Sequence, residues 1–260
     1  MLDHVTATRY VTPLREGGSL PGLMEADNLG TYVVKYRGAG QGAKALIAEV
    51  ISAALARMVG LPVPELVTVD VDPALASGEP DQEVQDLLRA SAGLNLGVDF
   101  LPGALDFDPR AFPVDSSAAG RVIWFDALVS NADRSHRNPN LLQWRGLWLI
   151  DHGATLPFHH RWSSAVSYDD RPYDVSDHVL ALSDPDITAA DAELAGLLST
   201  EAITEAVAEV PQSWLELDAD FSEVADVRTA YVARIQARLA ARDAWVPALV
   251  DAARRAGASA

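Results

Sequence analysis

Three oxygen-bearing side chains lie close together in the middle of the chain. Asp133 is followed after five residues by Asn138 and after thirteen more by Asp151. Carboxylate and amide oxygens are hard ligands that suit Mg²⁺, which takes one or two protein ligands and completes its shell with water and phosphate oxygens. The types and spacing of these residues therefore predict three oxygen ligands or bases on two adjacent short elements, a set that suits Mg²⁺.

The elements around these residues follow from the local pattern. Residues 121–129 are apolar enough for a buried helix, and the polar stretch that follows ends in a proline-containing turn. Two short apolar runs, 141–144 and 147–150, joined at Arg145-Gly146 then predict a hairpin. A hairpin folds back on itself, so Asn138 and Asp151 should lie side by side. In the alternative interpretation, the three polar residues only cap a turn and end a strand.

Lysine is rare in this chain, which has 18 Arg and only Lys35 and Lys44. Lys35 lies in the alternating apolar stretch TYVVKY, which predicts a strand in which an unpaired ammonium would be costly to bury. A compact cation suits phosphate oxygens, and a planar guanidinium would not replace it cleanly. We interpret Lys35 as a phosphate ligand; an exposed lysine on an edge strand is the alternative.

A known family matches these motifs. Asp-x4-Asn followed by Asp-x-Gly resembles the catalytic and metal loops of protein-kinase-like phosphotransferases. The form N-x-D-R-x-x-x-N, with Arg after the Asp, is similar to HipA-family kinases and to phosphoinositide kinases. HipA-like kinases are the better match, because residues 32–65 also resemble that family's lysine strand, its helix and its Gly-Leu-Pro-Val-Pro-Glu ending. The resemblance covers roughly residues 5–160.

The resemblance implies an α+β, bilobal, protein-kinase-like fold. We expect a small antiparallel β-sheet N-lobe with one helix in residues 1–101, and a mostly helical C-lobe in residues 102–260. The pattern predicts the remaining strands at 5–14, 20–26, 65–71 and 94–101, and further helices at 83–90, 192–198, 200–210, 224–241 and 246–256. The chain is expected to be a short member without the N-terminal subdomain of HipA.

The activity implied is Mg²⁺-dependent transfer of the ATP γ-phosphoryl group to a hydroxyl acceptor, with protein Ser or Thr favoured. By resemblance, Asp133 would orient the acceptor hydroxyl and take its proton, while Asn138 and Asp151 would hold Mg²⁺. Arg134 either neutralises charge near the transferring group or fixes the loop through an ion pair. The acceptor itself, protein or small molecule, is left open.

The predicted helix at 44–59 carries the expected partner of Lys35. Glu49 is the only carboxylate between Asp27 and Glu65, and it lies off the apolar stripe on a face of small residues. By resemblance, Glu49 would form the strand-to-helix ion pair that positions Lys35 on the α- and β-phosphates. A solvated Glu49 on an exposed face is the alternative.

Other nucleotide contacts are placed by resemblance alone. The turn at 15–19 would lie over the ATP phosphates, where Gly17 and Gly18 permit an anion-binding backbone, although the turn is not G-x-G-x-x-G. By analogy with HipA, Ser19 in this turn is a candidate for self-phosphorylation. Backbone groups from Asp99 to Leu101, just before a Pro-Gly hinge, would meet the adenine edge.

Histidines follow the metal motif. His152 stands in Asp-His-Gly where typical protein kinases have Phe, so a switch built on packing of that Phe is absent. The pair His159 and His160 suggests a metal site, but with no third ligand at convincing spacing a structural or cleft role is favoured. The acidic segment 168–177 would either select a cationic substrate or be a solvated loop.

Composition limits the partners. A formal net charge of −17 over 260 residues argues against nucleic acid, whose phosphates need a basic footprint. The chain has no Cys, which excludes disulfides and thiolate metal sites, and no stretch approaches the length of a membrane span. We therefore expect a cytoplasmic protein, and its oligomeric state is left open.

Alternative functions remain. Aminoglycoside- and choline-kinase-type enzymes share Asp-x4-Asn but typically have His-Gly-Asp before it and a second acid after the metal Asp. A lipid kinase would carry a basic surface. A nucleotide-binding pseudokinase acting as an interaction module is favoured by the absent G-x-G-x-x-G, and disfavoured by the complete set of Lys, Asp, Asn and Asp.

Overall fold

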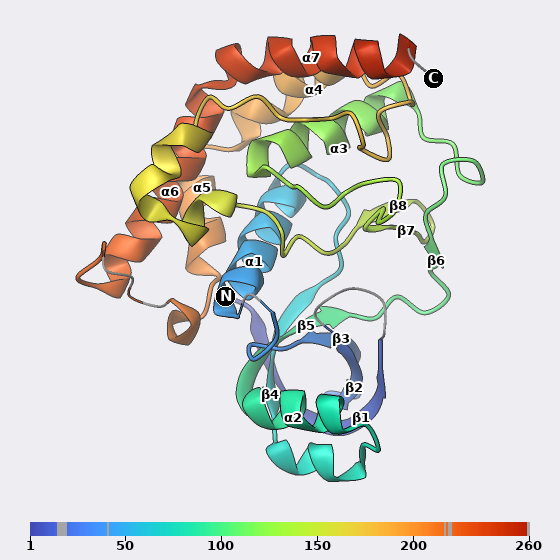
Figure 1. Cartoon of the computed structure of the whole chain (residues 1–260), viewed down its shortest axis with the longest axis vertical. Coiled ribbons are helices and arrows are strands. Elements are labelled where there is room, and N and C mark those ends of the chain that lie inside the picture. The colour runs from blue at the N-terminus through green and yellow to red at the C-terminus, as the bar shows by residue number, and fades with distance from the viewer. Residues whose placement is uncertain (15–19, 41, 216, 218–219, 259–260) are drawn as a thin grey trace. The chain divides into compact units, whose positions relative to one another are not determined.

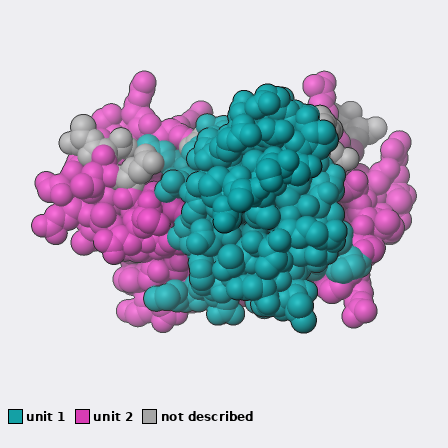
Figure 2. Space-filling model, turned by 90° about the horizontal axis from the view of Figure 1, so that it is seen from below, with its two compact units in different colours: residues 1–47, 64–102 teal, residues 48–63, 103–260 magenta. Residues whose placement is uncertain are grey.

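The computed structural model describes residues 1–14, 20–40, 42–215, 217 and 220–258 (Figure 1). The chain divides into two compact units, which are coloured separately in Figure 2. Unit 1 comprises Met1–Ile47 with Pro64–Pro102, and unit 2 comprises Ala48–Val63 with Gly103–Ala260. Unlike a single division after residue 101, this one places most of helix α1 (Ala43–Met58) in unit 2.

Unit 1 is built on a five-stranded closed barrel in the order β1-β2-β3-β5-β4. The strands are β1 (Asp3–Pro13), β2 (Gly22–Ala26), β3 (Thr31–Lys35), β4 (Leu66–Val71) and β5 (Gly93–Asp99). The strand positions agree with the sequence pattern, but the expected antiparallel sheet is wrong in one respect, because β1 pairs parallel with β4 and closes the barrel. Closure leaves no open strand edge, which removes a site for unwanted strand pairing.

The barrel has its own apolar core. Along β3, Tyr32 and Val34 are buried and alternate with partly exposed residues, as expected when one face of a strand points inward. Helix α2 (Gln82–Ala90), which Asp81 caps by accepting from the Glu83 N–H, adds Val84 and Leu88 to this core. The predicted amphipathic helix at 83–90 is therefore confirmed, and it covers apolar side chains of the barrel.

Unit 2 is organised around helix α3 (Ser116–Val129), which is buried along most of its length. Asp115 caps its N-terminus by accepting from the Ala118 N–H, so the helix begins five residues before the predicted start at 121. Gly120 lets another segment pass closely, because a Cβ there would lie 2.4 Å from the Asp186 carbonyl oxygen. Ser130 ends the helix in the left-handed conformation, with φ 54°.

The remaining helices of unit 2 follow the predicted order. They are α4 (Ile187–Leu194), α5 (Thr200–Ala208), α6 (Val224–Ala240) and α7 (Arg242–Ala258). Helix α4 begins five residues before the predicted start at 192, because Asp186 caps it on the Ala189 N–H. None of the helices in the described part of the chain has the length and apolar character needed to cross a bilayer.

The predicted hairpin is confirmed. Strands β7 (Leu141–Gln143) and β8 (Leu147–Leu149) pair antiparallel, and β6 (Leu105–Asp106) pairs with β7 to complete a three-stranded sheet. The turn between β7 and β8 includes Arg145 in the left-handed region, with φ 54°, followed by Gly146. This small sheet fixes the ends of the two loops that carry the predicted metal ligands.

Candidate active site

The loop that follows α3 brings two predicted site residues into contact. The side-chain amide of Asn138 donates to Oδ2 of Asp133 over 3.0 Å. Asp133 is partly exposed and Asn138 is exposed, so both remain accessible. Because the amide nitrogen of Asn138 is used by Asp133, its oxygen is the atom left for a cation.

The hairpin brings the segment before β7, which carries Asn138, and the segment after β8, which carries Asp151, to the same end of the sheet. Leu141 pairs with Leu149, and the Ile150 N–H then donates to the Asn140 carbonyl over 3.1 Å. Asp151 follows directly in the left-handed conformation, with φ 55°. Residues other than glycine rarely occupy this region, and such conformations cluster at functional sites.

These donors fit Mg²⁺ rather than a softer metal. Asn138 and Asp151 offer one amide and one carboxylate, which is a set that leaves most of the shell to water and phosphate. No group of three or more His, Cys, Asp or Glu side chains within the described residues could hold a metal by itself. An ion here would therefore depend on phosphate oxygens of a nucleotide to complete its coordination.

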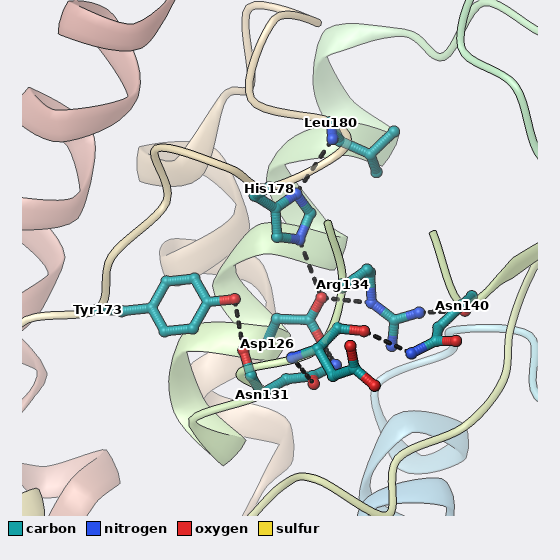
Figure 3. Close-up of polar contacts among 8 residues, drawn as sticks. Asp126, Asn131, Arg134, Asn140, Tyr173, His178 and Leu180 are labelled. Carbon is teal, nitrogen blue, oxygen red and sulfur yellow. Dashed lines mark hydrogen bonds and ion pairs between the residues drawn. The ribbon is translucent and has the colours of Figure 1, made fainter. Parts of the chain in front are cut away.

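A buried ion pair anchors the loop to α3 (Figure 3). Oδ2 of Asp126, on α3, accepts from Nε of Arg134 over 2.5 Å, and Oδ1 accepts from the Asn131 side chain over 2.9 Å. Arg134 also donates to the Asn140 carbonyl. The side chains of Arg134 and Asp126 are both 0% exposed. The guanidinium thus lies with Asp126, which favours the loop-fixing role of Arg134 over charge neutralisation at the transferring group.

Asp126 is held ionised by its partners. Burial alone would raise the pKa of Asp126, but the Arg134 charge and a hydrogen bond from His178 hold it well below its usual range. A buried charge is tolerated when it is paired and hydrogen-bonded, as it is here. Loss of Arg134 would leave this carboxylate without a compensating charge, and loss of His178 would remove one of its hydrogen bonds.

A distant segment, residues 172–180, is bound to the same loop. The Tyr173 hydroxyl donates to the Asn131 carbonyl over 2.7 Å, and the Val179 N–H donates to the Arg134 carbonyl over 3.2 Å. A cavity of about 410 Å³ lies between this segment and the loop, and Ala132 and Arg134, which flank Asp133 in the chain, are among its lining residues. Asp174 and Asp177 of the acidic segment line it too.

The loop after β8, residues 151–155, is anchored on helix α1. Nδ1 of the buried His152 lies 3.6 Å from Oε1 of Glu49, which is also buried. One helical turn further on, the Ser52 and Thr155 hydroxyls are 2.7 Å apart. Glu49 is therefore not on an exposed face, which rules out the solvated alternative. One contact of its carboxylate is with His152, a residue the sequence left without a role.

The nucleotide-contacting residues expected by resemblance belong mainly to unit 1. Lys35 is the last residue of β3 and is partly exposed. Lys35 belongs to unit 1 and Glu49 to unit 2, and their pairing stays a prediction. Asp99 is the last residue of β5. Burial raises the pKa of Asp99, and the nearby charge of Glu65 raises it further. Leu101 is buried. Gly17, Gly18 and Ser19 lie outside the described residues, so their expected roles also stay predictions.

The two further histidines have different surroundings. His159 is buried, and its Nδ1 lies 2.9 Å from the Tyr231 hydroxyl, whereas His160 is exposed. The rings of Tyr231 and Phe158 pack edge-on against the His159 ring. This setting supports the structural interpretation of His159 over a metal site.

Sequence reasoning missed Asp126, Tyr173 and His178. Asp126 could have been found, because it is the one carboxylate in the apolar run 121–129, where an acid must have a partner. His178 carries no comparable signal. It lies 52 residues from Asp126, and only the fold brings the two together.

Comparison with known proteins agrees with this architecture. The most informative solved structure is that of the Helicobacter pylori proinflammatory kinase CtkA, with a TM-score of 0.55 and 12% identity over 98% of this chain and 99% of that chain. The Golgi casein kinase matches with a TM-score of 0.42 and 12% identity over 93% and 74% of the two chains. No curated protein matches significantly.

The likeness to CtkA shows a kinase-like fold, and a family model identifies the sequence itself. The model for HipA-like kinases matches residues 8–247, which is most of the chain. The match includes residues 131–138, the hairpin and residues 151–153. This protein therefore belongs to the HipA-like kinase family.

Proposed function

We propose that the protein is an ATP- and Mg²⁺-dependent phosphotransferase that transfers the γ-phosphoryl group to a hydroxyl acceptor, most simply a protein Ser or Thr. The observation that carries the proposal is the contact between Asp133 and Asn138 at the open end of the hairpin that also presents Asp151. Membership of a kinase family supports the reaction class.

The roles of the residues follow from their chemistry. Asp133 accepts the proton of the acceptor hydroxyl as its oxygen bonds to the γ-phosphorus, while the bond from that phosphorus to the bridging oxygen of ADP breaks. Asn138 and Asp151 would hold Mg²⁺, which when bound neutralises phosphate charge. Lys35 is the proposed ligand of the α- and β-phosphates.

The buried residues keep this chemistry in place. Arg134 binds the loop to Asp126, so the backbone that carries Asp133 is held in place. Phosphoryl transfer depends mainly on positioning and electrostatics, so a rigid loop is a direct catalytic asset. The cavity lined by Ala132, Arg134, Tyr168 and residues 171–174 and 176–178 supports an acceptor that approaches Asp133 alongside the acidic segment.

The test is ATP turnover by an Asp151→Ala variant. The variant should remain folded, because Asp151 is partly exposed, and should lose turnover by orders of magnitude. Asp251→Ala is the matched control, since that carboxylate lies on α7 with 66% of its side chain exposed. Undiminished turnover in Asp151→Ala would refute the assignment.

Titration with ATP separates an enzyme from a binding module. A thermal-shift titration with ATP, with and without Mg²⁺, should show stabilisation that depends on the metal. ATP binding without turnover on any protein, peptide or metabolite acceptor would point instead to a nucleotide-binding pseudokinase. Phosphorylation of Ser19 after incubation with ATP is a separate proposal, and finding that serine unmodified would remove it.

A further inference from the structure

One buried histidine outside the expected site is connected to Asp133 through side chains. Nε2 of His178 lies 3.0 Å from Oδ2 of Asp126, the carboxylate that also holds Arg134. Oδ1 of the same carboxylate accepts from Asn131, whose own side-chain oxygen accepts from the Asp133 N–H over 3.0 Å. Figure 3 shows His178, Asp126 and Asn131 in this sequence of contacts. Three hydrogen bonds thus connect the imidazole to the backbone of Asp133.

The geometry also defines which nitrogen of the His178 imidazole carries the proton. The Leu180 N–H donates to Nδ1 of His178 over 3.1 Å, so Nδ1 carries no proton and Nε2 is the nitrogen that donates to Asp126. Both ring nitrogens are satisfied only in this neutral form. A proton on Nδ1 would face the Leu180 N–H and break the bond that holds the imidazole in its own segment.

The charges around His178 agree with the neutral form. Burial lowers its pKa, the Asp126 hydrogen bond and charge act in the opposite direction, and the charges of Arg134 and His136 lower it further. The pKa of His178 therefore stays below its usual 6.5. The imidazole is an oriented donor to Asp126 rather than a second cation beside Arg134.

We propose that His178 is a positioning residue of the phosphotransferase. Through Asp126 and Asn131, His178 fixes the loop that carries Asp133 to residues 172–180, the segment that lines the cavity described above. The inference rests on the function proposed above. The backbone of the segment is bound to the loop as well, since the His136 N–H donates to the Asp177 carbonyl over 3.2 Å. His178 is the residue that joins this contact to the buried carboxylate.

The two bonds of His178 can be separated by substitution. The amide nitrogen of Gln replaces Nε2, so His178→Gln keeps the donor to Asp126 and loses the acceptor for Leu180. The amide oxygen of Asn replaces Nδ1, so His178→Asn keeps the acceptor and leaves Asp126 without its donor. His178→Ala removes both bonds, and His4→Gln is the control, since the His4 ring bonds to Thr68 in the barrel of unit 1.

The experiment measures phosphate release from Mg-ATP, with water as the acceptor, in all four variants of the full chain. We expect kcat to fall roughly 10- to 100-fold in His178→Ala and His178→Asn, with the KM for ATP unchanged, and to be largely restored in His178→Gln. Equal kcat in all folded His178 variants and the natural protein would overturn the proposal. A loss shared equally by Asn and Gln would also overturn it, since it would show a packing role alone.

Amide hydrogen exchange makes the result independent of turnover. If the protein binds ATP without hydrolysing it, the proposed function fails, but the role of His178 is still tested by protection of residues 131–138. Exchange there should rise roughly tenfold in His178→Asn and stay close to the natural protein in His178→Gln. Unchanged protection in His178→Asn would refute the positioning role.

Discussion

The Asn138 side-chain amide donates to the Asp133 carboxylate over 3.0 Å, so the residue proposed to take the acceptor proton and a residue proposed to hold the metal lie in direct contact. This contact orients both groups before any substrate binds. It also leaves Asp133 hydrogen-bonded through one oxygen, with its other oxygen available to an acceptor hydroxyl. The two proposed roles are therefore coupled, and a change at one residue should disturb the other.

Replacing Asp133 by Asn tests the proposed base. The substitution keeps the size of the side chain but removes the proton acceptor, so we expect kcat to fall by roughly 10²- to 10⁴-fold. The midpoint of thermal unfolding should change little, because Asp133 is partly exposed. Single-turnover kinetics with Mg-ATP measure the chemical step directly, and a normal rate would show that Asp133 is not the base.

The two lysines of the chain provide a matched pair. Lys35→Met should weaken ATP turnover strongly because the ammonium proposed to meet the phosphates is lost, whereas Lys44→Met, near the start of α1, should retain it. Steady-state kinetics with ATP compare the two variants. Equal activity in both would argue against a phosphate contact by Lys35.

The buried pair of Asp126 and Arg134 should dominate the stability of the loop. Asp126→Ala leaves the guanidinium buried without its carboxylate, which is expected to lower the free energy of unfolding by about 3–5 kcal/mol. Urea denaturation measures this change. Arg89→Ala breaks an exposed pair with Asp86 and should leave the denaturation midpoint almost unchanged, and a similarly small effect of Asp126→Ala would contradict the assignment.

Acidification should destabilise the natural protein through His178. Its pKa in the folded state lies below the usual 6.5, so as the pH falls from 7.5 to 5.5 the unfolded chain takes up this proton more readily than the folded chain. Stability is then lost as the pH falls, and His178→Asn lacks this loss. Thermal unfolding of both proteins across this range should show their difference in midpoint shrinking toward pH 5.5. A constant difference would mean that His178 is not held neutral.

The parts of the site that the sequence predicted are local ones. Asp133, Asn138 and Asp151 lie on one loop and one hairpin, and the apolar runs and the Arg145-Gly146 turn are enough to place them at the same end. The helix capped by Asp115 began earlier than expected because the apolar pattern starts after the first turn. Local patterns thus located the elements and left their ends less certain.

The parts that could not be predicted depend on distant segments. Parallel pairing of β1 with β4 joins residues 64 positions apart in the sequence, such as Asp3 and Val67. No local turn signal predicts this pairing. The bond between His178 and Asp126 is of the same kind. The contact of Glu49 with His152 could not be predicted, because His152 comes from a loop over a hundred residues away, and the pairing of Glu49 with Lys35 stays a prediction.

Asp151 occupies a backbone geometry that glycine would adopt more comfortably. An Asp151→Gly protein should therefore be free of the backbone strain at this position, and under the proposed function it should be catalytically inert. The strained backbone at this position agrees with the metal-binding role proposed for the Asp151 carboxylate, since such conformations cluster at functional sites.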